Sequence, residues 1–177
     1  MFHQFPYRAF DRVRDNGVLE QVLRPTVDFT VSYGDNAGWS EDALIDTGSP
    51  ETLFSHEIGQ AISIPFLAPG SEYDSFRMLG HLQVAQKARV SLSLNKFPDI
   101  RWETDAWFFV EDWDWSLNVG AVFGTHGFLE QWAVTFVKSE DYFVVEDLDG
   151  FRTRTPPDVD DLTLARHDQD WWRPGLH

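Results

Sequence analysis

Alternation of polar and apolar residues predicts β-strands along most of the chain. In residues 26–33 the apolar side chains fall on one face, the pattern of a half-buried strand. These side chains belong to Val27, Phe29, Val31 and Tyr33. Residues 34–38 have the composition of a turn, and the apolar run ending at Ile45 predicts a buried strand. The two strands form the first predicted hairpin.

Further strands are predicted downstream by the same periodicity. They cover residues 88–94, 105–110, 133–137 and 142–146, with the last two forming a hairpin. A short helix is expected over residues 55–62, where Ser55 can cap it and Glu57 lies in the first turn. A second short helix is expected after Gly124. The chain is therefore predicted to be all-β, with one or two short helices.

The chain divides by composition into three parts. Residues 1–25 are mixed and charged and are predicted to form an N-terminal extension that ends at Pro25. Residues 26–147 hold the predicted strands and form one domain. Residues 148–177 are predicted to be an acidic C-terminal tail with prolines and with two adjacent tryptophans, which can dock on the domain.

Charge and cysteine content narrow the classes of partner. The formal net charge of −15 argues against nucleic acid and anionic membranes, because both would repel the chain. There are no cysteines, so disulfides and thiolate metal sites are excluded. No apolar run fits a signal peptide or is long enough to span a bilayer. We therefore expect a cytoplasmic protein.

The stretch around Asp46 has the best placed candidate for chemistry. An apolar run delivers this single carboxylate onto a turn made by Thr47, Gly48 and Ser49. A group at the end of a buried strand is held rigidly, as a catalytic group must be. Gly48 permits a sharp turn and close approach of a ligand, and the two hydroxyl side chains can orient the acid.

Two motifs resemble the single-lobed, retropepsin-like family of aspartic proteases. The first is apolar-apolar-Asp-Thr-Gly followed by a small residue, a hydroxyl residue and an apolar pair; it is filled here by Leu44, Ile45, Asp46, Thr47, Gly48, Ser49, Thr52, Leu53 and Phe54. The second is an apolar pair and a glycine, filled by Val122, Phe123 and Gly124. The resemblance covers roughly residues 26–146. It implies a closed β-barrel of the retropepsin-like acid protease type.

The resemblance also implies roles for individual residues. Asp46, Thr47 and Gly48 would be catalytic, and Val122, Phe123 and Gly124 would form a structural motif beside them. Ser49 would contact substrate, together with a flap hairpin whose tip lies at or near Gly80; the flap residues are Met78, Leu79, Gly80 and His81. An ordinary hairpin of a β-barrel is an equally open interpretation of this segment.

The implied activity is that of an aspartic endopeptidase acting on a protein or peptide substrate. Aspartic proteolysis uses two carboxylates around one water molecule, and this chain has only one Asp-Thr-Gly. A homodimer is therefore implied, with one Asp46 from each copy and with Thr47 hydrogen-bonded across the axis. No metal or organic cofactor is required.

Other interpretations remain open or fail at particular residues. The segment starting at His56 opens like a zinc-protease helix, but Gln60 stands where the second histidine is needed, so His56 is expected at the surface. The acidic, aromatic loop at 111–116 has the composition of a sugar-binding or glycosidase site as well as of a solvated surface. The same fold used as a non-catalytic peptide-binding or dimerisation module is an alternative, as is an unrelated β-rich binding protein.

Overall fold

The computed structural model describes residues 2–14, 16–78, 80–112 and 119–153. Most of these residues lie in strands, so the prediction of a mainly β protein with few short helices is confirmed. The helical elements are α1 (His56–Ala61), η1 (Thr125–Leu129), η2 (Lys138–Glu140) and α2 (Leu148–Thr153). Among the described residues, no helix is long and apolar enough to cross a membrane.

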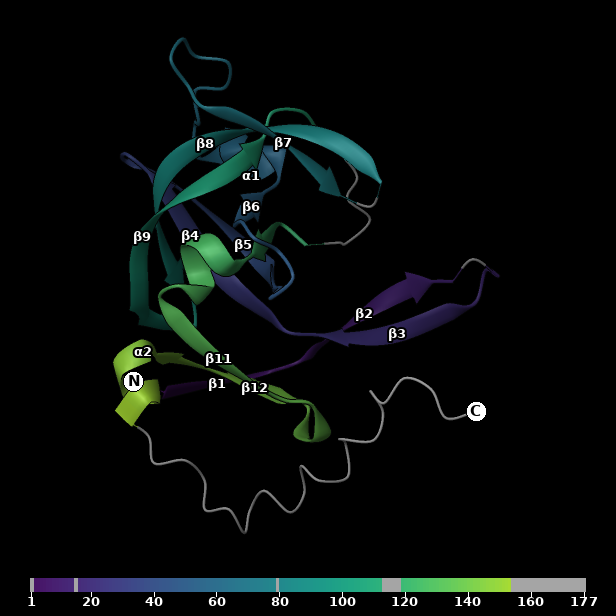
Figure 1. Cartoon of the computed structure of the whole chain (residues 1–177). Coiled ribbons are helices and arrows are strands. Elements are labelled where there is room, and N and C mark those ends of the chain that lie inside the picture. The colour runs from purple at the N-terminus through teal and green to yellow at the C-terminus, as the bar shows by residue number, and fades with distance from the viewer. Residues whose placement is uncertain (1, 15, 79, 113–118, 154–177) are drawn as a thin grey trace, which may run out of the picture.

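The largest sheet has seven strands in the order β4-β5-β10-β6-β9-β8-β7 (Figure 1). Their bounds are β4 (Thr26–Tyr33), β5 (Asn36–Ile45), β6 (Leu53–Phe54), β7 (Tyr73–Met78), β8 (His81–Leu94), β9 (Phe97–Phe109) and β10 (Ala121–Phe123). β4 also pairs with β8, so it has a partner on each side. Closure of this sheet into a barrel stays a prediction.

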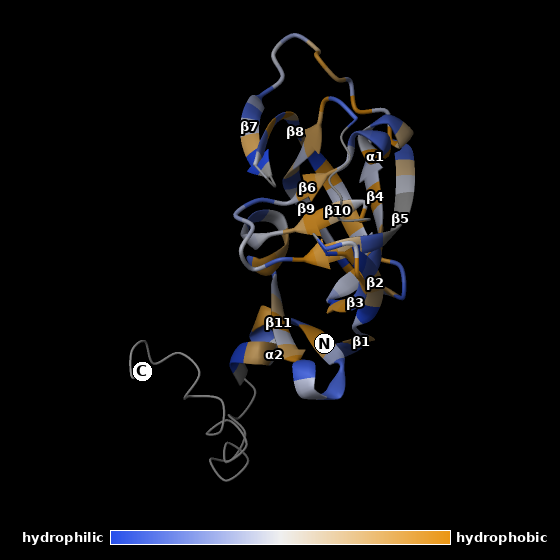
Figure 2. Ribbon diagram, turned by 90° about the vertical axis from the view of Figure 1, so that its right-hand side faces the viewer, coloured by the Kyte–Doolittle hydropathy of each residue, from blue (hydrophilic) through white to orange (hydrophobic). Residues whose placement is uncertain are grey.

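The pairing of β10 joins segments that are distant in the sequence. β10 lies parallel to β5 and antiparallel to β6, and β6 is in turn parallel to β9. Figure 2 shows hydrophobic residues concentrated on β6, β9 and β10, at the centre of the molecule. Strands paired and covered in this way are apolar along their length, which explains the continuous apolar runs near residues 45 and 122.

Aromatic rings form much of the core beneath these strands. Phe54 stacks on Phe108 with 4.8 Å between ring centroids, and Phe29 contacts both Phe54 and Phe123. Phe123 also stacks on Phe128 at 5.0 Å. All of these rings are fully buried, and each contributes about 1.5–3 kcal/mol relative to an exposed ring. Burial of Phe123 therefore fixes β10 directly before Gly124.

The two ends of the described chain meet in a separate three-stranded sheet. β1 (Phe2–Pro6), β12 (Tyr142–Asp147) and β11 (Trp132–Val137) are antiparallel, with β12 in the centre. The predicted hairpin at residues 133–146 is confirmed by β11 and β12. The strand at β1 was not predicted from the sequence. The domain boundaries after residues 25 and 147 stay predictions.

A third unit is a hairpin of β2 (Arg8–Val13) and β3 (Leu19–Arg24). In the described residues these strands pair only with each other. Figure 1 shows the hairpin extending away from both sheets. It lies in the sequence between β1 and β4.

The predicted helix at residues 55–62 is confirmed, but the one expected after Gly124 is not regular. The Ser55 hydroxyl oxygen accepts from the Ile58 N–H over 3.3 Å and caps α1. In η1, by contrast, Gly127 has φ of +95°. Its carbonyl accepts from the buried indole N–H of Trp102 over 2.6 Å. The chain bends at Gly127 to reach this partner, which breaks the helical pattern.

Candidate functional site

Asp46 is the first residue after β5, and its turn is held by main-chain hydrogen bonds. Its N–H donates to the Phe123 carbonyl at the end of β10 over 3.1 Å. Its own carbonyl accepts from the Ser49 N–H over 3.1 Å, which closes the turn. The carboxylate Oδ1 accepts from the Gly48 N–H over 2.9 Å. Asp46 is half-buried, whereas Thr47 and Gly48 are exposed. The carboxylate is thus oriented by its own loop.

Gly124 lies directly against the turn that carries Asp46. A Cβ added at Gly124 would come within 2.7 Å of the Ser49 carbonyl oxygen and would also overlap the Glu51 carbonyl. Because both are backbone atoms, the chain can approach this closely only with glycine at this position. The three residues of the second motif lie on β10 or directly after it: Val122, Phe123 and Gly124.

Thr52 links the turn to the segment after β10 by hydrogen bonds. Its side chain is fully buried, and its hydroxyl donates to the His126 carbonyl over 2.8 Å. The same hydroxyl oxygen accepts from the Gly124 N–H over 3.3 Å. The Thr125 N–H donates to the Ser49 carbonyl over 2.9 Å. The turn and the segment after β10 are therefore joined by a continuous set of hydrogen bonds. Thr52 belongs to the first motif, but its hydrogen bonds to the segment after β10 were not predicted from the sequence.

A groove with a volume of about 440 Å³ opens beside the carboxylate of Asp46. Its size is that of a pocket for a small ligand or a few side chains. It is lined by the end of β5, the Asp46 turn, β6, β10 and the second half of β7; the residues are Leu44, Asp46, Gly48, Ser49, Pro50, Glu51, Leu53, Ser75, Phe76, Arg77 and Val122. Asp46 therefore lines a groove whose walls are mainly apolar.

The predicted flap is the hairpin of β7 and β8. Met78 pairs with His81 across the turn, and Gly80 lies in this turn with φ of +86°. His81 and Gly80 are exposed and do not line the groove. The side chain of Met78 and all of Leu79 lie outside the described part of the chain. The residues of β7 that do line the groove come earlier in the strand: Ser75, Phe76 and Arg77.

These three residues were not predicted to contact the groove, because the glycine of the turn pointed to the tip of the hairpin. The available signal was Phe76, an aromatic residue between the polar residues Ser75 and Arg77. Phe76 packs against Trp107 of β9 with 5.3 Å between ring centroids. This contact holds β7 over the groove.

Charged groups of both signs lie around the groove. Glu51 accepts through Oε2 from the indole N–H of Trp107 over 3.3 Å. The ammonium group of Lys87 lies 5.1 Å from the centre of the Trp107 ring. The hydrogen bond to Glu72 raises the pKa of Lys87, and the charges of Glu72, Asp105 and Glu51 act in the same direction. Lys87 therefore carries a positive charge at neutral pH, on the Trp107 ring that also binds Glu51.

His56, expected at the surface, is partly exposed and has partners within the chain. It is half-buried at the start of α1, and its Nδ1 lies 3.0 Å from the carbonyl oxygen of Phe109. Its ring packs on Phe66 at 4.8 Å. The polar ring has a main-chain partner there, which explains why it tolerates partial burial. His56 connects α1 to the end of β9 and does not line the groove.

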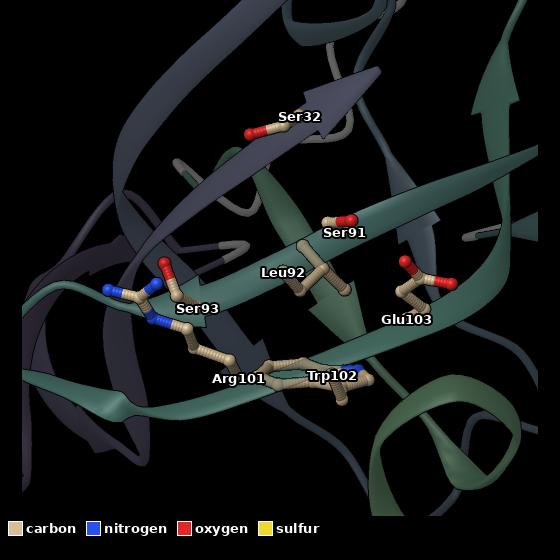
Figure 3. A pocket seen from close by; sticks show the side chains of 7 residues that line it. All are labelled: Ser32, Ser91, Leu92, Ser93, Arg101, Trp102 and Glu103. Atoms are coloured by element: carbon tan, nitrogen blue, oxygen red, sulfur yellow. The ribbon is translucent and has the colours of Figure 1, made fainter. Parts of the chain in front are cut away.

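A second depression lies on β4, β8 and β9, away from Asp46 (Figure 3). It is lined by Ser32, Ser91, Leu92, Ser93, Arg101, Trp102 and Glu103. Leu92 and Trp102 form its floor and belong to the core. Glu103 forms an ion pair with Arg89 at 3.7 Å, and Arg101 donates to the Pro98 carbonyl. Its charged groups thus have partners within the chain, and it lacks the fixed carboxylate found at Asp46.

The acidic loop at 111–116 lies mostly outside the described residues. Glu111 and Asp112 are exposed. The tryptophans at 113 and 115, on which the sugar-binding alternative depends, are not described, nor are those of the C-terminal tail. These two predictions stay untested.

Comparisons with known proteins give distant structural likenesses only. No family model matches the chain, and no curated protein matches it in sequence. Among solved structures, the chain is similar to a retropepsin-like aspartic protease from Rickettsia conorii. The two share 11% sequence identity with a TM-score of 0.42, over 80% of this chain and 94% of that one. The likeness is too distant to carry an argument about activity.

Proposed function

We propose that this chain is an aspartic-type endopeptidase that acts as a homodimer, with one Asp46 from each copy. The observation that carries the proposal is the position of Asp46. Asp46 directly follows a buried strand, its carboxylate is oriented by the Gly48 N–H, and the residue lines a groove that β7 borders. A group held in this way needs little reorganisation on reaching a transition state.

The reaction requires a second carboxylate close to the first. One ionised carboxylate takes a proton from a water molecule, which attacks the scissile carbonyl, while a protonated carboxylate donates to the carbonyl oxygen. Two such groups within a few ångströms cannot both ionise easily, so one proton is shared. No other acid among the groove-lining residues follows a buried strand as Asp46 does; Glu51 is held by Trp107. A second copy is therefore the proposed source of the partner acid.

Exposure of the Asp46 turn is compatible with this arrangement. Thr47 and Gly48 are exposed in a single copy. A twofold axis beside this turn would bring Asp46 close to its mate and would cover Thr47, whose hydroxyl would bond across the axis. The proposal includes a closed barrel, supported by the pairing of β4 with both β5 and β8.

Substrate would bind as an extended peptide between β7 and the Asp46 turn. Main-chain hydrogen bonds would supply affinity, and alternate side chains would enter pockets. The apolar walls formed by Leu44, Leu53, Phe76 and Val122 favour apolar side chains at the cleavage site.

The test compares cleavage of a quenched fluorescent peptide library by the wild type, Asp46→Asn and Asp35→Asn, from acid to neutral pH. Asp35 is exposed in the turn after β4, does not line the groove, and serves as the matched control. We expect cleavage by the wild type and by Asp35→Asn, and none by Asp46→Asn. Retained cleavage by Asp46→Asn would remove Asp46 from the mechanism.

Mixing the wild type with Asp46→Asn tests the shared site. With free exchange of subunits at concentrations where the dimer predominates, an equal amount of the variant lowers activity to about half, and a threefold excess lowers it to about one quarter. Mixing the wild type with Asp35→Asn instead should leave the activity per wild-type chain at or above the value measured without the variant. Activity that is insensitive to Asp46→Asn would mean that a single chain carries the whole site.

A non-catalytic peptide-binding module is the second candidate. β7 is the last strand of the seven-stranded sheet and has one unpaired edge among the described residues. An extended peptide could add to this edge by main-chain hydrogen bonds. Peptide binding without cleavage, unchanged in Asp46→Asn, would favour this candidate.

A further inference from the structure

The hairpin of β2 and β3, called the arm below, has the properties of a segment that packs on another chain. In the described residues its strands pair only with each other, and it extends away from both sheets (Figure 1). A two-stranded hairpin is at best marginally stable in water unless one face is covered. Strands of six residues extend about 20 Å, so the arm reaches well beyond the body of the domain.

The arm is fixed at its base. Arg8 Nη1 lies 2.6 Å from Asp28 Oδ1 and 3.1 Å from Asp42 Oδ1, on β4 and β5. The hydrogen bond to Asp28 raises the pKa of Arg8, so this cation stays charged at any relevant pH. The arm therefore leaves the domain in a defined direction.

Described residues near the tip of the arm are also held by hydrogen bonds. Arg14 Nε and Nη2 both donate to the Glu20 carboxylate over 2.6 Å, and the Val18 N–H donates to Asn16 Oδ1 over 3.1 Å. Gly17 takes the left-handed conformation that the turn needs, with φ of +77°. A hairpin with both ends fixed loses little conformational entropy when it binds.

One face of the arm carries two exposed apolar pairs, with the hydrogen-bonded polar pair Asp11–Gln21 between them. The cross-strand pairs Ala9–Leu23 and Val13–Leu19 fall on this face, because directly opposed residues point to the same side of a hairpin. Val13 is 67% exposed and Leu19 is 63% exposed. On the other face Phe10 is half-buried beneath Arg24. Apolar side chains that are aligned and left open in this way are typical of a contact surface.

Charge makes the arm the part of the chain best able to contact a second copy. Arg8 is paired with Asp28 and Asp42 at the base, and the remaining residues 9–24 hold three basic and three acidic side chains. Beyond its base the arm therefore has no net charge, whereas the rest of the chain is strongly acidic. Contacts made through a neutral arm limit the repulsion between two chains of net charge −15.

The direction of the arm agrees with the side on which a second copy would complete the site. In Figure 1 the arm and the β7–β8 hairpin both extend toward the right-hand side of the molecule. β7 borders the groove that holds Asp46. This step rests on the proposed function, in which a second copy approaches the groove to supply its own Asp46.

We propose that the arm clasps a second copy of this chain, with the face formed by Ala9, Val13, Leu19 and Leu23 packed on that copy. In a twofold dimer each arm makes the same contact with the other copy, so the apolar side chains of both arms are covered. The arm adds a contact surface to the dimer outside the groove.

The first experiment measures dimer dissociation by sedimentation of the full chain. The double variant Val13→Ser with Leu19→Ser removes apolar surface that is exposed in a single copy, so the fold should survive. We expect its dissociation constant to rise at least about tenfold. The matched control is Leu67→Ser, at a side chain that is 75% exposed in a loop and should leave the constant unchanged. A wild type that stays monomeric, or equal constants for all three proteins, would overturn the proposal.

The second experiment asks whether the arm touches another copy. Because the chain has no cysteine, Leu19→Cys carries a benzophenone label at a single place. Irradiation of a mixture of ¹⁴N and ¹⁵N chains should give cross-links of mixed isotope content, whereas Leu67→Cys should give few. Cross-links confined to one chain would show that the arm folds back on its own domain.

The arm proposal and the peptidase proposal can each fail while the other holds. An arm variant with an unchanged dimer, together with half activity in the Asp46→Asn mixture, would reject the arm and keep the peptidase. A dimer weakened by the arm variant, together with no cleavage of any peptide, would keep the arm and reject the peptidase.

Discussion

Replacing Gly124 by alanine would place a methyl group where the end of β10 meets the Asp46 turn. The new Cβ would lie 2.7 Å from the Ser49 carbonyl oxygen and closer still to that of Glu51. Overpacking of this kind costs about 1–3 kcal/mol, and we expect the upper end because backbone atoms give way less easily than side chains. At an m-value of about 2 kcal/mol/M, a loss of about 3 kcal/mol lowers the urea midpoint by about 1.5 M.

The assay is equilibrium unfolding in urea, followed by tryptophan fluorescence at one protein concentration. Gly34→Ala is the control, since Gly34 has φ of +57° and open space around its Cβ position. This substitution carries only the cost of the left-handed backbone, about 1 kcal/mol, or about 0.5 M in midpoint. If Gly124→Ala is no less stable than Gly34→Ala, β10 and the turn are not held as close as described. Asp46 would then not be rigidly placed.

Three further predictions concern the turn, the axis and the arm. Thr52→Val should destabilise the fold by about 2 kcal/mol, because it leaves buried main-chain groups unpaired, and Thr52→Ser should recover most of the loss in the same urea assay. Thr47→Ala should weaken the dimer in sedimentation, and an unchanged constant would count against a bond across the axis. The hydrogen bond from Arg14 lowers the pKa of Glu20, so this pair stabilises the arm at neutral pH. The stability difference between wild type and Glu20→Gln should therefore vanish as pH falls through the pKa of folded Glu20, which pH-dependent unfolding can follow; a constant difference would contradict the assignment.

Local periodicity was sufficient where one face of a strand is buried. Residues 26–33 alternate in polarity, and β4 has these bounds. The alternation is visible because one face of the strand packs on the core while the other is more exposed to solvent. β9 runs much further than the predicted strand at 105–110. Its first half alternates exposed and buried residues in a pattern broken by Pro98, which hides the period.

Long-range contacts could not be predicted in the same way. Nothing near Thr52 signals that its hydroxyl bonds to residue 126, since the partner lies far along the chain. The strand at β1 depends on its pairing with β12, and its own residues are too few to show a period. For Asp46, only its place after an apolar run could be read from the sequence; its role in catalysis is still a prediction.

Pairing of β1 with β12 has a consequence for synthesis of the chain. Phe2 is opposite Glu146, so the three-stranded sheet cannot form until almost all of the described residues have left the ribosome. The Asp46 turn must likewise wait for β10 and the segment that contains Thr125. A growing chain therefore carries the Asp-Thr-Gly sequence long before it can hold the carboxylate in place. If the chain is a peptidase, the nascent polypeptide is inactive until β10 and Thr125 have emerged to hold the Asp46 turn.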